Sequence, residues 1–121
     1  MENTAKKTAI LGSGNIGMSL AKGLVKSNYC AASDIILTRR NVQNLSSEQS
    51  QGYRVSSDNY AAAAEASVVI LAVLPQQLDN LLEQIDGAID PAKHLVISVI
   101  SGVSCADVRA KLGSRVQVVR A

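Results

Sequence analysis

Residues 8–17 of this chain are Thr8-Ala9-Ile10-Leu11-Gly12-Ser13-Gly14-Asn15-Ile16-Gly17. A short apolar run leads directly into the spacing G-x-G-x-x-G, and an amphipathic segment follows it. This order predicts a strand, a tight turn and a helix whose free N–H groups hold the pyrophosphate of a dinucleotide. We expect Gly12 to turn the chain, Gly14 to let a phosphate approach the backbone, and Gly17 to let the helix pack closely on the strand.

The residues after the turn make the motif more specific, because G-x-G-x-x-G alone is a weak signal. Ile16, Leu20 and Leu24 recur every four residues, as a helix that faces a core requires. The spacing therefore predicts a helix over residues 16–27. A second interpretation, a glycine-rich turn that binds no ligand, stays open, although it leaves Gly14 without a structural purpose.

The composition indicates one α/β domain. The chain has 121 residues, of which 47% are hydrophobic and only 2% aromatic, so the core is built from Ala, Val, Ile and Leu. The net charge of +2 is too small to indicate a nucleic-acid partner. The start of the chain does not resemble a signal peptide, and no apolar run has membrane-spanning length. Two distant cysteines without C-x-x-C spacing favour free thiols, so we expect a cytoplasmic protein.

Strands and helices are predicted to alternate strictly along the chain. This order predicts a doubly wound, parallel, six-stranded sheet of the Rossmann type, in one domain over residues 1–121. The predicted strands are residues 8–11, 35–38, 53–55, 67–73, 94–100 and 116–119, and the predicted helices are residues 16–27, 42–51, 60–65, 76–85 and 104–112.

The end of the second strand indicates which dinucleotide is bound. The strand ends Leu37-Thr38-Arg39-Arg40-Asn41, and no acidic residue occurs between Asp34 and Glu48. A carboxylate that would accept hydrogen bonds from an unphosphorylated ribose is therefore missing, and Arg39 and Arg40 stand where a 2′-phosphate would lie. Thr38 offers a hydroxyl donor to the same phosphate. The pattern predicts NADP(H), with two solvated loop arginines as the alternative.

Several motifs in the same order together resemble one family, the pyrroline-5-carboxylate reductases. The opening Ile10-Leu11-Gly12-Ser13-Gly14-Asn15-Ile16-Gly17 looks like the family's GxGNMG start, and Ala72-Val73-Leu74-Pro75-Gln76 looks like its AVKPQ. Val96-Ile97-Ser98-Val99-Ile100-Ser101-Gly102-Val103-Ser104 is similar to its AGV-containing stretch. Val118-Val119-Arg120-Ala121 looks like the lead-in to its RxMPN motif. The resemblance covers essentially the whole chain.

The resemblance implies a set of cofactor-binding residues along the carboxyl edge of the sheet. Asn59 would contact the adenosine side, although a helix cap is an equally good interpretation of this residue. The implied set is Gly12, Ser13, Gly14, Asn15, Ile16 and Gly17 at the pyrophosphate, Thr38, Arg39 and Arg40 at the 2′-phosphate, Asn59, and Ala72, Val73, Leu74, Pro75, Ser98, Val99 and Ile100 on the path to the nicotinamide.

The resemblance also implies a reaction, hydride transfer from NADPH to the C=N carbon of 1-pyrroline-5-carboxylate, which gives L-proline. In the family, a C-terminal helical domain completes the substrate pocket and makes the dimer. We expect that domain to be absent from residues 1–121, which would then bind NADPH with little or no turnover. The full-length protein would be a homo-oligomeric oxidoreductase that acts on a small imine.

Two positions depart from the family pattern. Leu74 stands where the family has Lys, and Ile100 with Ser101 replaces a pair of small residues, which we expect to crowd the nicotinamide. Another imine or a carbonyl substrate is therefore an open alternative. So are the cofactor domain of a β-hydroxyacid, prephenate or deazaflavin-linked NADP reductase, and a dinucleotide-sensing module without catalysis.

No residue of the chain is predicted to be catalytic. His94 is the only histidine, and it begins a strand at the end opposite the expected crevice, which favours a surface or capping role. Cys30 and Cys105 have no histidine at a spacing that indicates a nucleophile pair. The sequence also shows no cluster with metal-ligand spacing, so no metal is expected.

Overall fold

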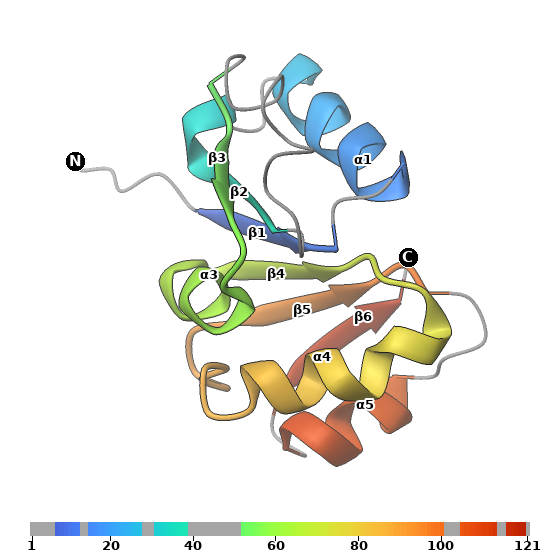
Figure 1. Cartoon of the computed structure of the whole chain (residues 1–121). Coiled ribbons are helices and arrows are strands. Elements are labelled where there is room, and N and C mark those ends of the chain that lie inside the picture. Colours follow the sequence, from blue (N-terminus) through green and yellow to red (C-terminus); the bar gives the residue numbers. More distant parts are fainter. Residues whose placement is uncertain are drawn as a thin grey trace.

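Six parallel strands form a single sheet in this protein (Figure 1). The computed structural model describes residues 7–12, 15–27, 31–38, 52–100, 105–113 and 116–120. The strands are β1 (Thr8–Leu11), β2 (Ile35–Thr38), β3 (Arg54–Ser56), β4 (Val68–Leu71), β5 (Leu95–Ser98) and β6 (Gln117–Arg120). They lie in the order β3-β2-β1-β4-β5-β6, and every pairing is parallel. The predicted doubly wound fold is confirmed.

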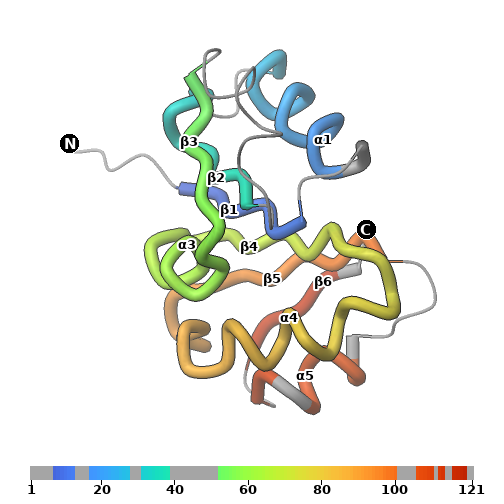
Figure 2. The backbone as a smooth tube through the Cα atoms, viewed as in Figure 1, coloured from blue at the N-terminus to red at the C-terminus, as the bar shows by residue number. Residues whose placement is uncertain are grey.

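Helices cover both faces of the sheet. Helix α1 (Asn15–Lys26) lies on one side, and α4 (Leu78–Ile85) and α5 (Cys105–Leu112) lie on the other (Figure 1). Helix α3 (Asn59–Glu65) carries the chain from β3 back to β4, as the tube in Figure 2 shows. Two short 3₁₀ helices, η1 (Ala32–Asp34) and η3 (Pro75–Gln77), precede β2 and α4.

The apolar core is divided into two clusters by the sheet. Ile10 packs in one cluster and its neighbour Leu11 in the other, because successive side chains of a strand point to opposite faces. The α4 stripe of Leu78, Leu81, Leu82 and Ile85 is buried in the larger cluster, as its helical spacing predicts. Strand β1 thus contributes buried residues to both clusters, as its place between β2 and β4 requires.

Several element boundaries differ from the sequence prediction. Strand β4 ends at Leu71 rather than at residue 73, because the chain leaves the sheet to form η3. The Gln77 side chain accepts a hydrogen bond from the Leu74 amide at 3.2 Å, which fixes that exit. Strand β5 is also shorter than predicted and leaves out His94. The helix predicted over residues 42–51 lies outside the described residues. No described helix is long and apolar enough to cross a membrane.

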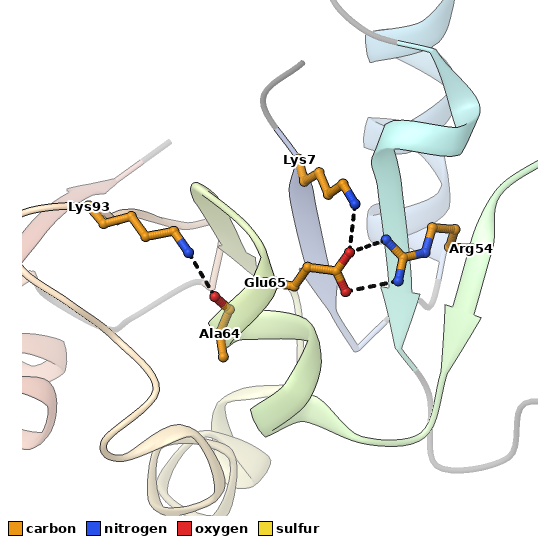
Figure 3. Close-up of polar contacts among 5 residues, drawn as sticks. All are labelled: Lys7, Arg54, Ala64, Glu65 and Lys93. Atoms are coloured by element: carbon orange, nitrogen blue, oxygen red, sulfur yellow. Dashed lines mark hydrogen bonds and ion pairs between the residues drawn. The ribbon is translucent and has the colours of Figure 1, made fainter. Parts of the chain in front are cut away.

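A charge network joins α3, β3 and the residue before β1 at the amino-terminal edge of the sheet (Figure 3). Glu65, at the end of α3, forms ion pairs with Arg54 of β3 and with Lys7, whose Nζ lies 2.7 Å from Glu65 Oε2. Arg54 is bidentate, since its second guanidinium nitrogen lies 2.8 Å from Glu65 Oε1. The hydrogen bonds from Arg54 first, and then from Lys7, lower the pKa of Glu65 from 4.5 to about 2.

Replacing Glu65 with glutamine is expected to remove an acid-sensitive part of the stability. Because the folded pKa of Glu65 lies below its unfolded value, its contribution is present above about pH 4.5 and is lost as the pH falls toward 2. The side chains are 38–43% exposed, so solvent screening limits the effect to about 0.5–1 kcal/mol. Urea unfolding of the two proteins between pH 7 and pH 3 measures the difference, which should shrink on acidification.

A matched control for this prediction is Glu83→Gln, since Glu83 is an exposed carboxylate on α4. Such surface substitutions typically change the free energy of unfolding by less than about 0.5 kcal/mol. A difference between Glu65→Gln and the parent that does not vary with pH would contradict the role assigned to the ion pairs.

Candidate functional site

The turn after β1 has the backbone geometry that the glycine motif predicts. Gly12 has a φ of 84°, in the region that favours glycine. A Cβ at this position would lie 2.3 Å from Val73 Cγ1 and 3.2 Å from the Ala72 carbonyl oxygen. Both the conformation and the space therefore require glycine, because the segment that follows β4 passes directly against the turn.

The first turn of α1 packs closely on β1, as expected for Gly17. A Cβ on Gly17 would lie 3.1 Å from Ile10 Cγ2 and 3.3 Å from the Gly12 carbonyl oxygen. Helix α1 begins at Asn15, three residues after Gly12. Its N-terminus is therefore held at the carboxyl end of β1, where its free N–H groups and dipole favour a phosphate.

The carboxyl ends of four strands are aligned at this edge of the sheet. Leu11 is the register partner of Thr38 on β2 and of Leu71 on β4, and Leu71 is in turn the partner of Ser98 on β5. The strand order reverses between β1 and β4, because the chain goes from β1 to β2 on one side and from β4 to β5 on the other. Such a switch point in an open α/β sheet is where ligands bind.

The predicted residues after β4 and β5 lie at this edge in different environments. Ala72, Val73 and Val99 are half-buried, whereas the Leu74 side chain is 57% exposed and Pro75 begins η3. Ser98 is buried, and its hydroxyl oxygen accepts a hydrogen bond from the Ile100 amide at 3.4 Å. The segments therefore offer backbone and small side chains to the edge, with Leu74 as the large exposed apolar group.

Ile100 does not lie in the open part of this edge. Its side chain is 4% exposed and belongs to the larger core cluster, on the side of the sheet that α4 and α5 cover. We expected Ile100 to crowd the nicotinamide, but packing in the core accounts for this side chain. The sequence alone could not tell whether Ile100 lies in the core or at the cofactor site, because the predicted strand ran to residue 100 whereas β5 ends at Ser98.

Asn59 is not the cap of α3. It is the first residue of the helix, and Asp58 is the cap, because an Asp58 carboxylate oxygen accepts from the Ala61 amide at 3.1 Å. The side-chain nitrogen of Asn59, Nδ2, donates to Gln84 Oε1 at 2.6 Å. The side-chain oxygen of Asn59, Oδ1, is buried without a hydrogen-bond partner among the described residues. The capping interpretation is therefore wrong, and the contact with adenosine stays a prediction.

Some predicted residues lie outside the described part of the chain. These are Ser13, Gly14, Arg39 and Arg40, together with the side chains of Asn15 and Ile16. Their roles at the pyrophosphate and the 2′-phosphate stay predictions. Cys30 also lies outside, and Cys105 is the first residue of α5.

His94 is a buried structural residue rather than a surface one. Its ring is 4% exposed, with Nδ1 2.8 Å from the Asp90 amide nitrogen and Nε2 2.8 Å from the Ala63 carbonyl oxygen. Since the Asp90 N–H donates to Nδ1, the ring proton is assigned to Nε2, which donates to Ala63. The predicted surface position is therefore wrong, and the sequence did not indicate the burial. No cluster of three or more metal-ligating side chains occurs in the described ranges.

The sheet order and the glycine turn at its switch point define a dinucleotide-binding domain of the Rossmann type. Residues 7–102 match the family described as "NADP oxidoreductase coenzyme F420-dependent", and the chain belongs to this family. The predicted NADP(H) cofactor agrees with that description. The deazaflavin-linked alternative in the sequence analysis corresponds to the same family.

The relatives carry the name that the sequence motifs indicated. The chain is 41% identical over 113 residues to pyrroline-5-carboxylate reductase 1 of Dictyostelium discoideum, covering 93% of this chain and 20% of that protein. It is 36% identical to the pyrroline-5-carboxylate reductase of Vibrio alginolyticus, covering 95% and 42%. The structure of a pyrroline-5-carboxylate reductase from Coxiella burnetii superposes with a TM-score of 0.88 at 29% identity, covering 97% and 43%. The resemblance is thus confirmed, and the chain spans less than half the length of these relatives.

Proposed function

We propose that this chain is the NADP(H)-binding part of a reductase that converts 1-pyrroline-5-carboxylate into L-proline. The observation that carries the proposal is the Gly12 turn, held between β2 and β4 at the switch point of the sheet. Sequence identity of 36–41% to pyrroline-5-carboxylate reductases over most of the chain supports the substrate class.

We propose that the binding of the cofactor is divided between the two sides of β1. On the β2 side, Gly12 and the start of α1 would hold the pyrophosphate, and Arg39 and Arg40 would bind the 2′-phosphate. On the β4 side, Ala72 and Val73 would orient the nicotinamide through backbone and small side chains. When bound, the cofactor supplies the hydride, and the protein supplies position and electrostatics.

The substrate pocket needs more than the described residues. The chain spans less than half of its relatives, so we propose that a further, C-terminal helical domain completes the pocket and makes a homo-oligomer. Leu74 would form an apolar part of the rim, because its side chain is 57% exposed at the carboxyl edge of β4. We also propose a cytoplasmic location, to be checked by fractionation of cells that contain the full-length protein.

The family description favours a second candidate, a reductase that exchanges hydride between NADP(H) and a deazaflavin coenzyme. The two candidates differ in the hydride acceptor. NADPH oxidation by the full-length protein with 1-pyrroline-5-carboxylate supports the first, and oxidation with an oxidised deazaflavin supports the second. NADPH binding without oxidation in either assay would indicate a sensing module.

Replacing Arg39 or Arg40 with alanine is expected to weaken NADPH binding selectively. Hydrogen bonds to charged groups contribute about 1.5–3 kcal/mol, so loss of one phosphate contact should raise the Kd for NADPH by about 10- to 150-fold. The Kd for NADH should stay unchanged, because NADH has no 2′-phosphate. Calorimetric titration with both cofactors measures the two effects.

Arg109→Ala is the control for this titration, since Arg109 lies on α5, on the face of the sheet opposite α1. It should leave both affinities as they are. Equal affinity of the unmodified protein for NADPH and NADH would contradict the NADP(H) assignment.

A further inference from the structure

We infer that Thr38 is a positioning residue for the pyrophosphate turn and does not itself bind the 2′-phosphate. The inference rests on the proposed binding of NADP(H), and it concerns how the Gly12 turn is held. Thr38 is the last residue of β2 and lies directly before Arg39, which is why the sequence alone indicates a phosphate contact.

The hydroxyl of Thr38 is directed at β1. The side-chain oxygen accepts a hydrogen bond from the Gly12 amide at a nitrogen–oxygen distance of 3.2 Å. Thr38 is the register partner of Leu11, the residue that precedes Gly12. It is also only 1% exposed, so its side chain lies inside the sheet edge rather than on an open surface. The hydroxyl is therefore placed to act on the turn.

Among the described residues, hydrogen bonds reach the start of the turn from β2 and from the segment that follows β4. On the β4 side, the Leu11 carbonyl accepts from the Ala72 amide at 3.0 Å, a contact between backbone groups. On the β2 side, the contact depends on a side chain, that of Thr38. Since every residue except proline supplies a backbone N–H but few supply a hydroxyl, the residue type at position 38 controls the hydrogen bond on the β2 side.

This geometry makes a prediction that separates positioning from direct phosphate recognition. The pyrophosphate is common to NADPH and NADH, whereas the 2′-phosphate belongs to NADPH alone. If Thr38 acts through Gly12, its loss weakens the binding of both cofactors by the same factor. If Thr38 binds the 2′-phosphate, its loss weakens the binding of NADPH alone.

Thr38→Val tests the inference, because valine keeps the shape of the side chain and lacks the hydroxyl. We expect the Kd values for NADPH and NADH to rise together by about 5- to 30-fold, because the Gly12 amide loses its acceptor. Thr38→Ser keeps the hydroxyl and should stay within about twofold of the unmodified protein. An effect of Thr38→Val on NADPH alone, or on neither cofactor, would overturn the inference.

Amide hydrogen exchange without cofactor provides a readout that is independent of the proposed function. The Gly12 amide should be protected in the unmodified protein and should exchange at least about tenfold faster in Thr38→Val, with protection restored in Thr38→Ser. The Ala72 amide, which bonds to the Leu11 carbonyl, is the internal control and should change little. Failure to bind either cofactor would refute the proposed function, whereas an unprotected Gly12 amide would refute the hydrogen bond.

If Thr38→Val does not fold, Thr38→Ala replaces it in both measurements, with Thr38→Ser as the comparison. Should neither variant fold, exchange of the Gly12 amide in the unmodified protein decides the point. Protection comparable to that of Ala72 supports the inference, and rapid exchange of Gly12 overturns it.

Discussion

Replacing Gly12 with alanine is expected to abolish tight NADPH binding and to lower the free energy of unfolding by about 2–4 kcal/mol. A Cβ at Gly12 would lie 2.3 Å from Val73 Cγ1, and the φ of 84° is unfavourable for any residue with a side chain. Relief of this overlap moves the turn away from the β4 side, where the Ala72 carbonyl oxygen is also within 3.2 Å. The start of α1 then loses its position relative to the phosphates.

The matched control for Gly12 is another glycine of the same region. Gly23 lies on α1, where an added Cβ would meet no atom within 4 Å. Gly23→Ala should raise the free energy of unfolding by up to about 1 kcal/mol, because alanine favours a helix interior over glycine. Urea unfolding and NADPH titration of both variants measure the contrast. Tight NADPH binding by Gly12→Ala would contradict the proposed geometry of the turn.

Replacing His94 with alanine is expected to lower the free energy of unfolding by about 2–4 kcal/mol without changing the affinity for NADPH. The substitution removes a buried ring and both of its hydrogen bonds, to the Asp90 amide and the Ala63 carbonyl. The bond to Ala63 ties the loop before β5 to α3, and the bond from Asp90 lies within that loop. They lie at the amino-terminal edge of the sheet, opposite the strand ends that form the candidate site.

Lys93→Ala provides a comparison within the same loop. The Lys93 ammonium donates to the Ala64 carbonyl at 2.9 Å, but the residue is exposed (Figure 3). Its loss should therefore cost less than about 1 kcal/mol. Chemical unfolding and NADPH titration of the two variants give the comparison. A His94→Ala protein of normal stability that had lost NADPH binding would show that the histidine acts in the site and would contradict the structural role.

The fold could be predicted from local patterns, because the same apolar residues that favour each strand or helix are also the ones that it buries. The apolar run before Gly12 forms the central strand β1. The helically spaced residues of α4 form its buried face, namely Leu78, Leu81, Leu82 and Ile85. The boundaries were less predictable. Strand β4 ends at Leu71, and the turn after it brings the Gln77 side chain back to the Leu74 amide, a contact that apolar spacing does not indicate.

The candidate site was only partly predictable. The need for glycine at positions 12 and 17 followed from the motif and is confirmed by the close contacts of both residues. Ile100 and Asn59 were harder to place. The neighbours of these side chains, the core under α4 for Ile100 and Gln84 for Asn59, come from segments distant in the sequence.

The alternation of strands and helices and the place of the glycine turn follow from local features of the amino-acid sequence, because apolar spacing and backbone freedom are local properties of the chain. The contacts of each side chain near the turn depend instead on how the chain folds. Thr38 and Gly12 are 26 positions apart, and His94 and Ala63 are 31 apart. Such contacts form when parallel strands align and helices pack on them. The residue types therefore indicate that Thr38 and His94 can form hydrogen bonds, but the partner of each depends on the folded structure.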